Sequence, residues 1–189
     1  MAQVVLIRHG ETEWSAAGRH TSYSEPPLTR RGEEQARRLG KLLGGVAFTA
    51  VLCSPRQRAR RTAELAGLTV SAVVEDLAEW NYGEYEGATT AEIRLERPGW
   101  TLWRDGCPGG ESPEQVQARI DHLLSGVRSL AGQGDVALIG HAHSMRVVAA
   151  RWLGLPAAGG ALFRLDVGRL SILGYEREQP VLLRWNSPT

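Results

Sequence analysis

The chain has 189 residues, a net charge of +1, and 42% hydrophobic residues. This length suits one domain with a single large core, and the balanced charge argues against nucleic acid or an anionic membrane as a partner. No apolar run approaches the roughly 20 residues that span a bilayer, and no leader pattern precedes the first predicted strand. Cys53 and Cys107 form no metal-binding or disulfide pattern. We therefore expect one cytoplasmic domain over residues 1–189.

The first predicted element is a strand over Val4–Ile7, which leads directly into Arg8-His9-Gly10. An unbroken apolar run is typical of a strand buried on both faces of a parallel sheet. Polar residues after such a strand lie at its carboxyl end, where open α/β sheets bind ligands. Arginine offers a fork of donors to phosphate, and an imidazole nitrogen can act as a nucleophile. The alternative at this point is two solvated polar residues at a strand end.

Helical and strand patterns then alternate. A helix is predicted over Leu28–Leu43, with Thr29 as its N-cap. A buried strand over Val51–Cys53 follows, and then a helix over Arg56–Ala66 with Pro55 in its first turn. This alternation favours an α/β fold with a largely parallel sheet.

The middle of the chain is less regular. Leu68–Val74 is a weaker strand candidate, and Trp80–Gly110 is rich in Trp, Gly and Pro, with one short helix near Ala91–Glu96. We interpret residues 80–110 as a lid-like insertion over the carboxyl edge of the sheet. A long helix is predicted from Ser112 to about Leu130, with a proline in its first turn.

The last third of the chain completes the predicted sheet. A third buried strand over Val136–Ile139 runs into Gly140-His141 and a helix to about Leu153. Three further segments are predicted as edge strands: Leu162–Val167, Ser171–Tyr175 and Val181–Trp185. The expected architecture is a three-layer αβα sandwich with a mostly parallel central sheet.

Three predicted strands end in groups suited to phosphate. Arg8 and His9 follow the first strand, an arginine-rich segment after Ser54 follows the second, and His141 follows the third. Parallel strands bring their carboxyl ends to one edge of a sheet. Elements far apart in the sequence are therefore expected to build one cationic pocket.

At this point the chain resembles the histidine phosphatase superfamily, also called phosphoglycerate mutase-like. The resemblance covers nearly the whole chain and rests on four motifs in order. They are Arg8-His9-Gly10-Glu11-Thr12, Ser54-Pro55 with Arg58 and Thr62-Ala63, Glu79 before Tyr82-Gly83 and Glu86-Gly87, and Gly140-His141. Within the superfamily the chain looks closest to the branch of sedoheptulose bisphosphatase and mycobacterial-type acid phosphatases.

The resemblance implies roles for five residues. His9 would attack phosphorus and form a phosphohistidine intermediate, and Glu79 would protonate the leaving alcohol and then activate water. Arg8, Arg58 and His141 would surround the transferred phosphoryl group. Such a pocket needs no metal and no other cofactor. Without the resemblance, Glu79 could equally be a solvated loop carboxylate among its acidic neighbours.

The same resemblance suggests a substrate wall. Its candidate residues are Ser15, Thr21, Ser22, Tyr23, Tyr82, Trp103, Arg104, Ala142 and His143. His143 could equally cap a helix or lie in the core, and the tryptophans of residues 80–110 could be packing anchors. His20 lies in the loop after the first strand, within reach of the same pocket.

Departures from the mutases of the superfamily favour hydrolysis. Trp80 and Thr90 stand where mutases carry an arginine and a lysine that hold the substrate carboxylate. The predicted function is therefore a metal-independent phosphomonoesterase acting on small phosphorylated metabolites, with sugar phosphates foremost. The alternatives are a cofactor-dependent phosphoglycerate mutase and a non-catalytic binder of phosphorylated ligands. The expected partner is the small phosphorylated substrate, with a homodimer as a further option.

Overall fold

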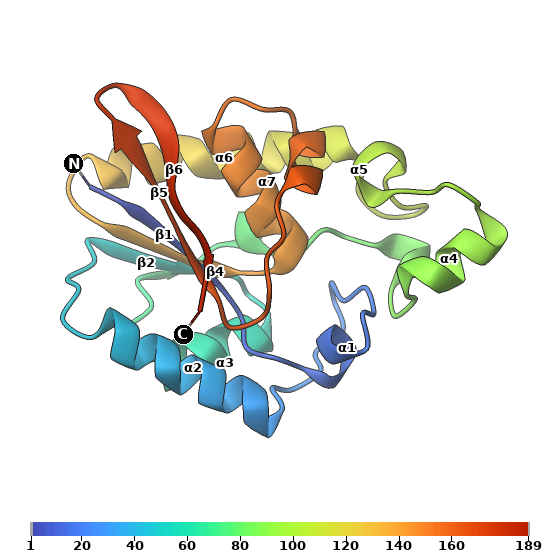
Figure 1. The fold of residues 1–189 in the computed structure, drawn as a ribbon, viewed down its shortest axis with the longest axis horizontal. Coiled ribbons are helices and arrows are strands. Elements are labelled where there is room, and N and C mark those ends of the chain that lie inside the picture. The colour runs from blue at the N-terminus through green and yellow to red at the C-terminus, as the bar shows by residue number, and fades with distance from the viewer. Residues whose placement is uncertain (1, 189) are drawn as a thin grey trace.

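The computed structural model describes residues 2–188 and contains one six-stranded sheet with helices on both faces (Figure 1). The strand order is β3-β2-β4-β1-β5-β6. The first four strands are parallel, β5 pairs antiparallel with β1, and β6 pairs antiparallel with β5. The strands are β1 Val4–Arg8, β2 Ala50–Cys53, β3 Ala72–Val73, β4 Val136–Gly140, β5 Leu170–Glu176 and β6 Gln179–Ser187. The predicted αβα sandwich with a mostly parallel sheet is confirmed.

Four helices form the outer layers. Helices α2 (Arg30–Leu43) and α3 (Gln57–Leu65) cover one face, and α6 (Pro113–Ala131) and α7 (Ala142–Trp152) cover the other (Figure 1). The shorter elements are α1 Glu13–Ala16, α4 Thr90–Glu96, α5 Leu102–Asp105 and three 3-10 turns at Glu75–Leu77, Gly83–Tyr85 and Ala157–Leu162. No helix within residues 2–188 is long and apolar enough to cross a membrane.

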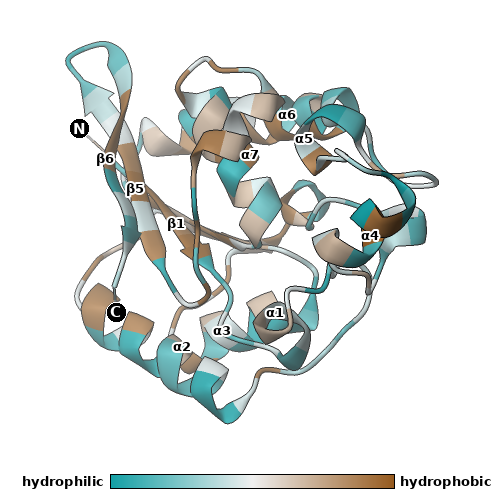
Figure 2. Cartoon of the chain, turned by 45° about the vertical axis from the view of Figure 1, so that its right-hand side comes forward, coloured by the Kyte–Doolittle hydropathy of each residue, from teal (hydrophilic) through white to brown (hydrophobic). Residues whose placement is uncertain are grey.

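Strand β1 is buried because both of its faces are covered. Val4 and Leu6 belong to the core cluster under α6 and α7, whereas Val5 and Ile7 belong to the cluster under α2 and α3. Successive side chains of a strand point to opposite faces, so a central strand needs apolar residues at every position. Apolar colouring accordingly follows the strands and the inner sides of the helices (Figure 2).

The helix boundaries follow their capping residues. The Thr29 side chain accepts a hydrogen bond from the Gly32 amide at 3.0 Å and starts α2, as predicted. Ser112 and Gln115 form a reciprocal capping box at the start of α6, with Pro113 as its first residue.

Two predictions about the second strand's neighbours need correction. Pro55 does not lie in the first turn of α3, because Arg56 is the N-cap in an extended conformation and the helix begins at Gln57. The strand predicted over Leu68–Val74 is reduced to Ala72–Val73, since only these residues pair with β2 at the edge of the sheet. The α5 turn at Leu102–Asp105 was not predicted.

The prediction of a strand over Leu162–Val167 is wrong. The backbone here binds the residues at the end of β1 instead of a sheet ladder: the Leu165 carbonyl accepts from the Arg8 side chain, and the amide of Gly168, just after the segment, donates to the His9 carbonyl at 2.9 Å. Asn186 at the end of β6 fixes the segment, since its side chain accepts from the Asp166 amide at 2.9 Å.

The start of α2 lies directly against the loop after β1. A Cβ atom on Gly32 would lie 2.1 Å from the Glu11 carbonyl oxygen, and one on Gly10 would lie 2.3 Å from the Gly32 carbonyl oxygen. Both neighbours are backbone atoms, which cannot rotate away. Glycine is therefore required on both sides of this contact.

We expect Gly32→Ala to lower the free energy of unfolding by about 2 kcal/mol or more, because the methyl group overpacks a backbone contact. Gly126→Ala is the matched control. Gly126 is exposed in α6 with open space around its Cα, so alanine should raise stability by about 0.5–1 kcal/mol. Urea unfolding of both variants measures the difference, and equal stability of the two would contradict the contact.

Candidate active site

The carboxyl ends of β1, β4 and β2 meet at one edge of the sheet. Arg8 pairs with Gly140 and Cys53 pairs with Ile139 in the parallel register. The His9 amide donates to the Gly140 carbonyl at 3.0 Å, which carries the pairing one residue past the strand. His9 and His141 therefore lie side by side, with ring centroids 5.2 Å apart.

His9 is held as a neutral imidazole with one free nitrogen. Its Nδ1 lies 2.7 Å from the Gly10 carbonyl, so Nδ1 carries the proton and donates it. Burial, followed by repulsion from Arg58 and Arg8, holds the pKa of His9 well below its usual range. The lone pair on Nε2 is then available for attack on phosphorus.

A threonine ties the His9 loop to α3. The Thr62 hydroxyl accepts a hydrogen bond from the Gly10 amide at 3.0 Å and donates to the Arg58 carbonyl at 2.8 Å. Thr62 is fully buried, so this bridge is shielded from water. It sets the position of the His9 loop relative to Arg58, the arginine that follows β2.

Two arginines point guanidinium groups into the same region. Arg58 is 1% exposed and donates to the carbonyls of Ser24 and Thr21, each at 2.9 Å. Arg8 is held through one terminal nitrogen by the Leu165 carbonyl. Backbone carbonyls orient both groups, and Arg58 also lies 3.9 Å from the Glu25 carboxylate.

His141 is oriented by Ser54 at the end of β2. Ser54 Oγ lies 2.7 Å from His141 Nε2 and also accepts from the Arg56 amide at 3.3 Å. The hydroxyl proton is therefore free to be donated to Nε2, which places the ring proton on Nδ1. Burial, then repulsion from Arg58, keeps the pKa of His141 well below its usual range.

Three of these groups have buried nitrogens that lack a partner within residues 2–188. They are Arg8 Nε, Arg58 Nε and His141 Nδ1. Buried donors are almost always satisfied, so each such atom requires an explanation. Three donors on converging side chains fit the oxygens of a bound phosphoryl group.

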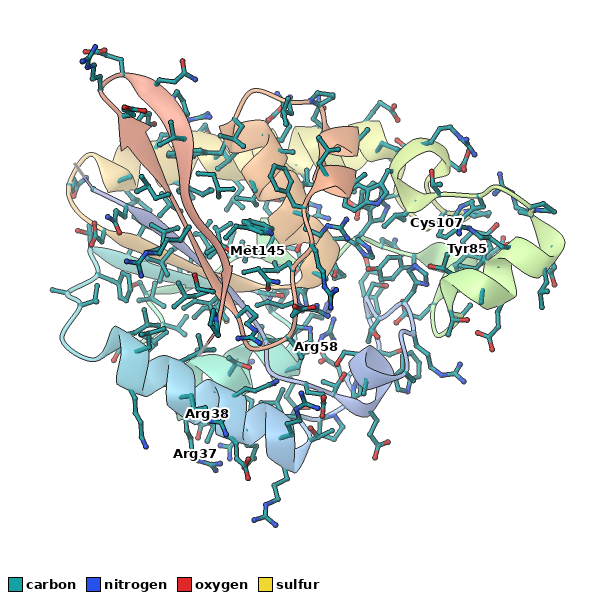
Figure 3. All side chains as sticks on the ribbon, viewed as in Figure 1. Arg37, Arg38, Arg58, Tyr85, Cys107 and Met145 are labelled. Carbon is teal, nitrogen blue, oxygen red and sulfur yellow. The ribbon has the colours of Figure 1, made fainter. Side chains whose placement is uncertain are left out.

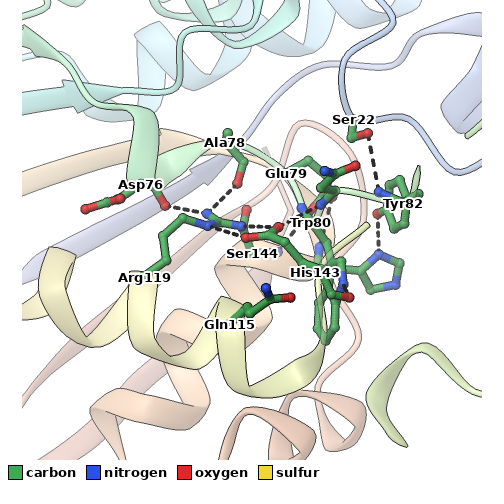
Figure 4. A network of polar contacts seen from close by, with 12 residues as sticks. Ser22, Asp76, Ala78, Glu79, Trp80, Tyr82, Gln115, Arg119, His143 and Ser144 are labelled. Carbon is green, nitrogen blue, oxygen red and sulfur yellow. Dashed lines mark hydrogen bonds and ion pairs between the residues drawn. The ribbon is translucent and has the colours of Figure 1, made fainter. Parts of the chain in front are cut away.

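Glu79 lies beside this group at the N-terminus of α7 (Figure 4). The side chain is 6% exposed and accepts from the amides of Ser144 at 2.8 Å, Trp80 at 2.9 Å and His143 at 3.1 Å. Three fixed donors and the positive end of a helix dipole position the carboxyl group. Glu79 is therefore not a solvated loop carboxylate, which was the alternative left open by the sequence.

The chain before Glu79 is fixed by Arg119 of α6 (Figure 4). One terminal nitrogen of Arg119 donates to the carbonyls of Asp76 at 2.7 Å and Ala78 at 3.0 Å. The rest of its guanidinium forms a two-point ion pair with Glu111, with both contacts at 2.9 Å. This bridge joins α6, the residue that follows segment 80–110, and the backbone that presents Glu79.

A cavity of about 160 Å³ opens at His9. It is lined by Arg8, His9, Thr12, Ser15, Gly18, Arg19, His20, Thr21, Arg58, Glu79, Tyr82, Thr90, Ala142 and His143. Five residues of the predicted wall are therefore at the cavity: Ser15, Thr21, Tyr82, Ala142 and His143. A larger cavity of about 790 Å³ outside α3 is lined by neither His9 nor Glu79.

Four residues of the predicted wall are not brought to the cavity. Arg104 is exposed and pairs with Asp105 at 2.8 Å, and Tyr23 is 59% exposed with Arg56 over its ring. Ser22 donates to Glu86 instead. Trp103 does not line the cavity, but its ring makes an edge contact with the His143 ring, which does, with the centroids 5.3 Å apart.

The tryptophans of residues 80–110 are packing anchors. Trp80 is fully buried and donates from its ring nitrogen to the Glu111 carbonyl at 2.9 Å, and Trp100 is 2% exposed. Residues 80–110 thus pack into the main core while contributing Tyr82 and Thr90 to the cavity. Closure of this segment as a lid stays a prediction.

Some cavity residues were not among the predicted site residues. Thr12 and Thr90 line the cavity, and so does His20, whose Nδ1 lies 2.7 Å from the Ala88 carbonyl. Thr12 could have been found from its position three residues after His9. The approach of Thr90 depends on backbone pairing between residues 19–20 and 87–89, which has no local signal.

The comparisons with known proteins agree with this geometry. Residues 4–188 match the family model described as the histidine phosphatase superfamily, branch 1. The chain belongs to this superfamily. It is 45% identical over 176 residues to an acid phosphatase of Mycobacterium tuberculosis, covering 92% of this chain and 87% of that protein.

Two further matches support the same assignment. The sedoheptulose 1,7-bisphosphatase of Saccharomyces cerevisiae is 35% identical, over 80% of this chain and 67% of that protein. A solved structure of an open reading frame product from Mycobacterium tuberculosis superposes with a TM-score of 0.96 at 42% identity, covering 99% of this chain and 98% of the other. The chain is therefore an enzyme of the phosphatase class, as predicted.

We expect the His9 and His141 rings to stay neutral as pH falls through 6.5, because their pKa values in the folded chain are depressed. The unfolded chain takes up these protons near pH 6.5. The free energy of unfolding is therefore highest above pH 6.5 and falls as the pH drops toward the depressed pKa values of the folded chain. Each such histidine should lower it by about 1.4 kcal/mol between pH 7.5 and pH 5.5.

Ring-proton NMR of the folded chain and of the chain in urea measures this difference. The folded rings should show no titration step near pH 6.5, whereas the unfolded rings should titrate there. A midpoint near 6.5 for His9 in the folded chain would contradict the buried neutral nucleophile.

Proposed function

We propose that this chain is a metal-independent phosphomonoesterase that hydrolyses small phosphorylated metabolites, with sugar phosphates preferred, through a phosphohistidine on His9. The observation that supports it most directly is the set of three unpartnered donors on Arg8, Arg58 and His141 beside the free Nε2 of His9. The Arg8 and Arg58 guanidinium groups supply the positive charge that metal ions provide in many phosphoryl-transfer sites.

In the first step, His9 Nε2 attacks phosphorus in line with the leaving oxygen. The N–P bond forms as the P–O bond breaks, and the alcohol oxygen takes a proton from Glu79. In the second step, water attacks the phosphohistidine and gives its proton to Glu79. The P–N electron pair returns to Nε2, and inorganic phosphate leaves.

The lining of the cavity supports a hydroxyl-rich substrate. The hydroxyl-bearing residues Thr12, Ser15, Thr21, Tyr82 and Thr90 line this cavity. Such groups both donate and accept hydrogen bonds, as sugar hydroxyls do. The proposed preference for sugar phosphates is also supported by the sedoheptulose bisphosphatase among the relatives of this chain.

Location and partners follow as further parts of the proposal. Cys53 and Cys107 are both buried free thiols, which supports the cytoplasm as the location. The net charge of +1 supports a small phosphorylated metabolite as partner in preference to nucleic acid or a membrane. A homodimer stays a prediction.

The test is phosphate release from a panel of sugar phosphates, sugar bisphosphates and phosphoglycerates after treatment with a chelator. We expect release to persist, with sugar phosphates giving the higher kcat/KM. Glu79→Gln should lower kcat by about 10²–10⁴-fold. Glu84→Gln is the matched control, because Glu84 is an exposed carboxylate outside the cavity.

Three results would overturn parts of this proposal. Loss of activity with chelator and its return with a divalent metal would exclude the metal-independent route. Interconversion of phosphoglycerates faster than phosphate release would establish the mutase alternative. Binding of the panel without turnover would establish a non-catalytic binder.

A further inference from the structure

A second polar cavity lies between α2 and the loop that precedes β5. Its volume is about 300 Å³, and its lining is formed by Arg31, Glu34, Gln35, Arg38, Val167 and Arg169. It shares no lining residue with the cavity at His9. Figure 3 labels Arg38 on α2, apart from Arg58 near the catalytic edge.

The charges around this cavity are unbalanced. Three guanidinium groups face one carboxylate, Glu34, which already lies 3.4 Å from Arg30 outside the cavity. Arg31 reaches Glu11 at 3.5 Å. Within residues 2–188, neither Arg38 nor Arg169 has a carboxylate within ion-pair distance.

The floor of the cavity is rigid and tied to the catalytic loop. Gly168 has φ +62°, and a Cβ atom there would lie 2.6 Å from Gln35 Cβ, so loop and helix are in direct contact. The Gln35 side-chain oxygen accepts from the Glu11 amide at 2.9 Å. The Gly168 amide donates to the His9 carbonyl at 2.9 Å, and the Arg8 amide donates to the Arg169 carbonyl at 3.0 Å.

We propose that this cavity is a second anion site, which binds the phosphate or diphosphate group of a small molecule outside the active site. Arginine forks match the oxygens of a tetrahedral phosphate and form strong charge-assisted hydrogen bonds with them. The lining contains no Ser, Thr, Cys or His side chain, so we propose a binding site and assign it no reaction.

The location gives this site a direct connection to catalysis. Arg169 and Gly168 both hold the backbone at Arg8 and His9, and Arg31 pairs with Glu11 two residues further on. An anion bound by Arg31 and Arg169 therefore acts on the segment that positions the nucleophile. Since the two cavities are separate, the ligand does not compete with substrate for the phosphate pocket.

The test is titration calorimetry on protein whose active site is filled with orthovanadate. Inorganic phosphate and inorganic pyrophosphate are the two probes, and malonate at equal ionic strength is the carboxylate comparator. We expect one further binding event for at least one phosphate probe. Tighter binding of pyrophosphate supports a diphosphate metabolite, and equal or tighter binding of phosphate supports free phosphate.

Arg38→Gln combined with Arg169→Gln should weaken this event about tenfold or more. Arg37→Gln is the matched control. Arg37 immediately precedes Arg38 on α2, pairs with Glu33 at 2.9 Å and does not line the cavity. Both substituted side chains of the double variant lie at the surface of a helix and a loop, and circular dichroism confirms the fold.

Three results would overturn the proposal: no binding to vanadate-filled protein, equal binding by the double variant, or malonate binding as tightly as the phosphate probes. The measurement requires no turnover. Failure of the proposed hydrolysis would therefore leave this result unaffected, and the two can be judged separately.

Discussion

The structure depends on one electrostatic constraint: donors that belong to Arg8, Arg58 and His141 are buried at one point without an internal acceptor. Burial of a hydrogen-bond donor is costly unless an acceptor satisfies it. The parallel pairing of β1, β4 and β2 creates this situation, because it brings the ends of three separate strands together. A bound phosphoryl group would accept hydrogen bonds from these donors and so remove the cost of burying them. The folded protein would therefore favour binding of both the substrate and the transition state.

The same burial prepares the nucleophile. His9 is buried, and two neighbouring cations disfavour its protonation, so the ring stays neutral. The Gly10 carbonyl then decides which nitrogen holds the proton. Glu79 differs from the histidine because it accepts from three amides at a helix N-terminus and is held at a fixed position beside the leaving group. The different surroundings of His9 and Glu79 thus suit them to different roles within one small cavity, His9 as nucleophile and Glu79 as acid.

Much of this arrangement was predictable from sequence. Continuous apolar runs marked β1, β2 and β4 because buried parallel strands need apolar residues on both faces. The residues after those runs predicted a cationic pocket at the sheet edge, and the structure brings Arg8, His9 and His141 together there. Thr29 and Pro113 marked helix starts because their chemistry acts locally.

The remaining features depend on contacts between distant segments. Leu165 and its neighbours have a strand-like sequence, yet their backbone groups bind Arg8 and His9. Arg104 lies in the right segment, but its partner is the adjacent Asp105. Irregular chain such as residues 80–110 has no periodic pattern to reveal which side chains face a cavity.

The most direct test of the central claim is rapid acid-free quenching of the enzyme during turnover, followed by mass spectrometry of the peptide that contains His9. The account predicts a phosphorylated His9 that forms within one turnover, decays in water at the rate of phosphate release, and is absent from His9→Ala. Turnover by His9→Ala at the rate of the unmodified enzyme, or phosphate found on another residue, would contradict it.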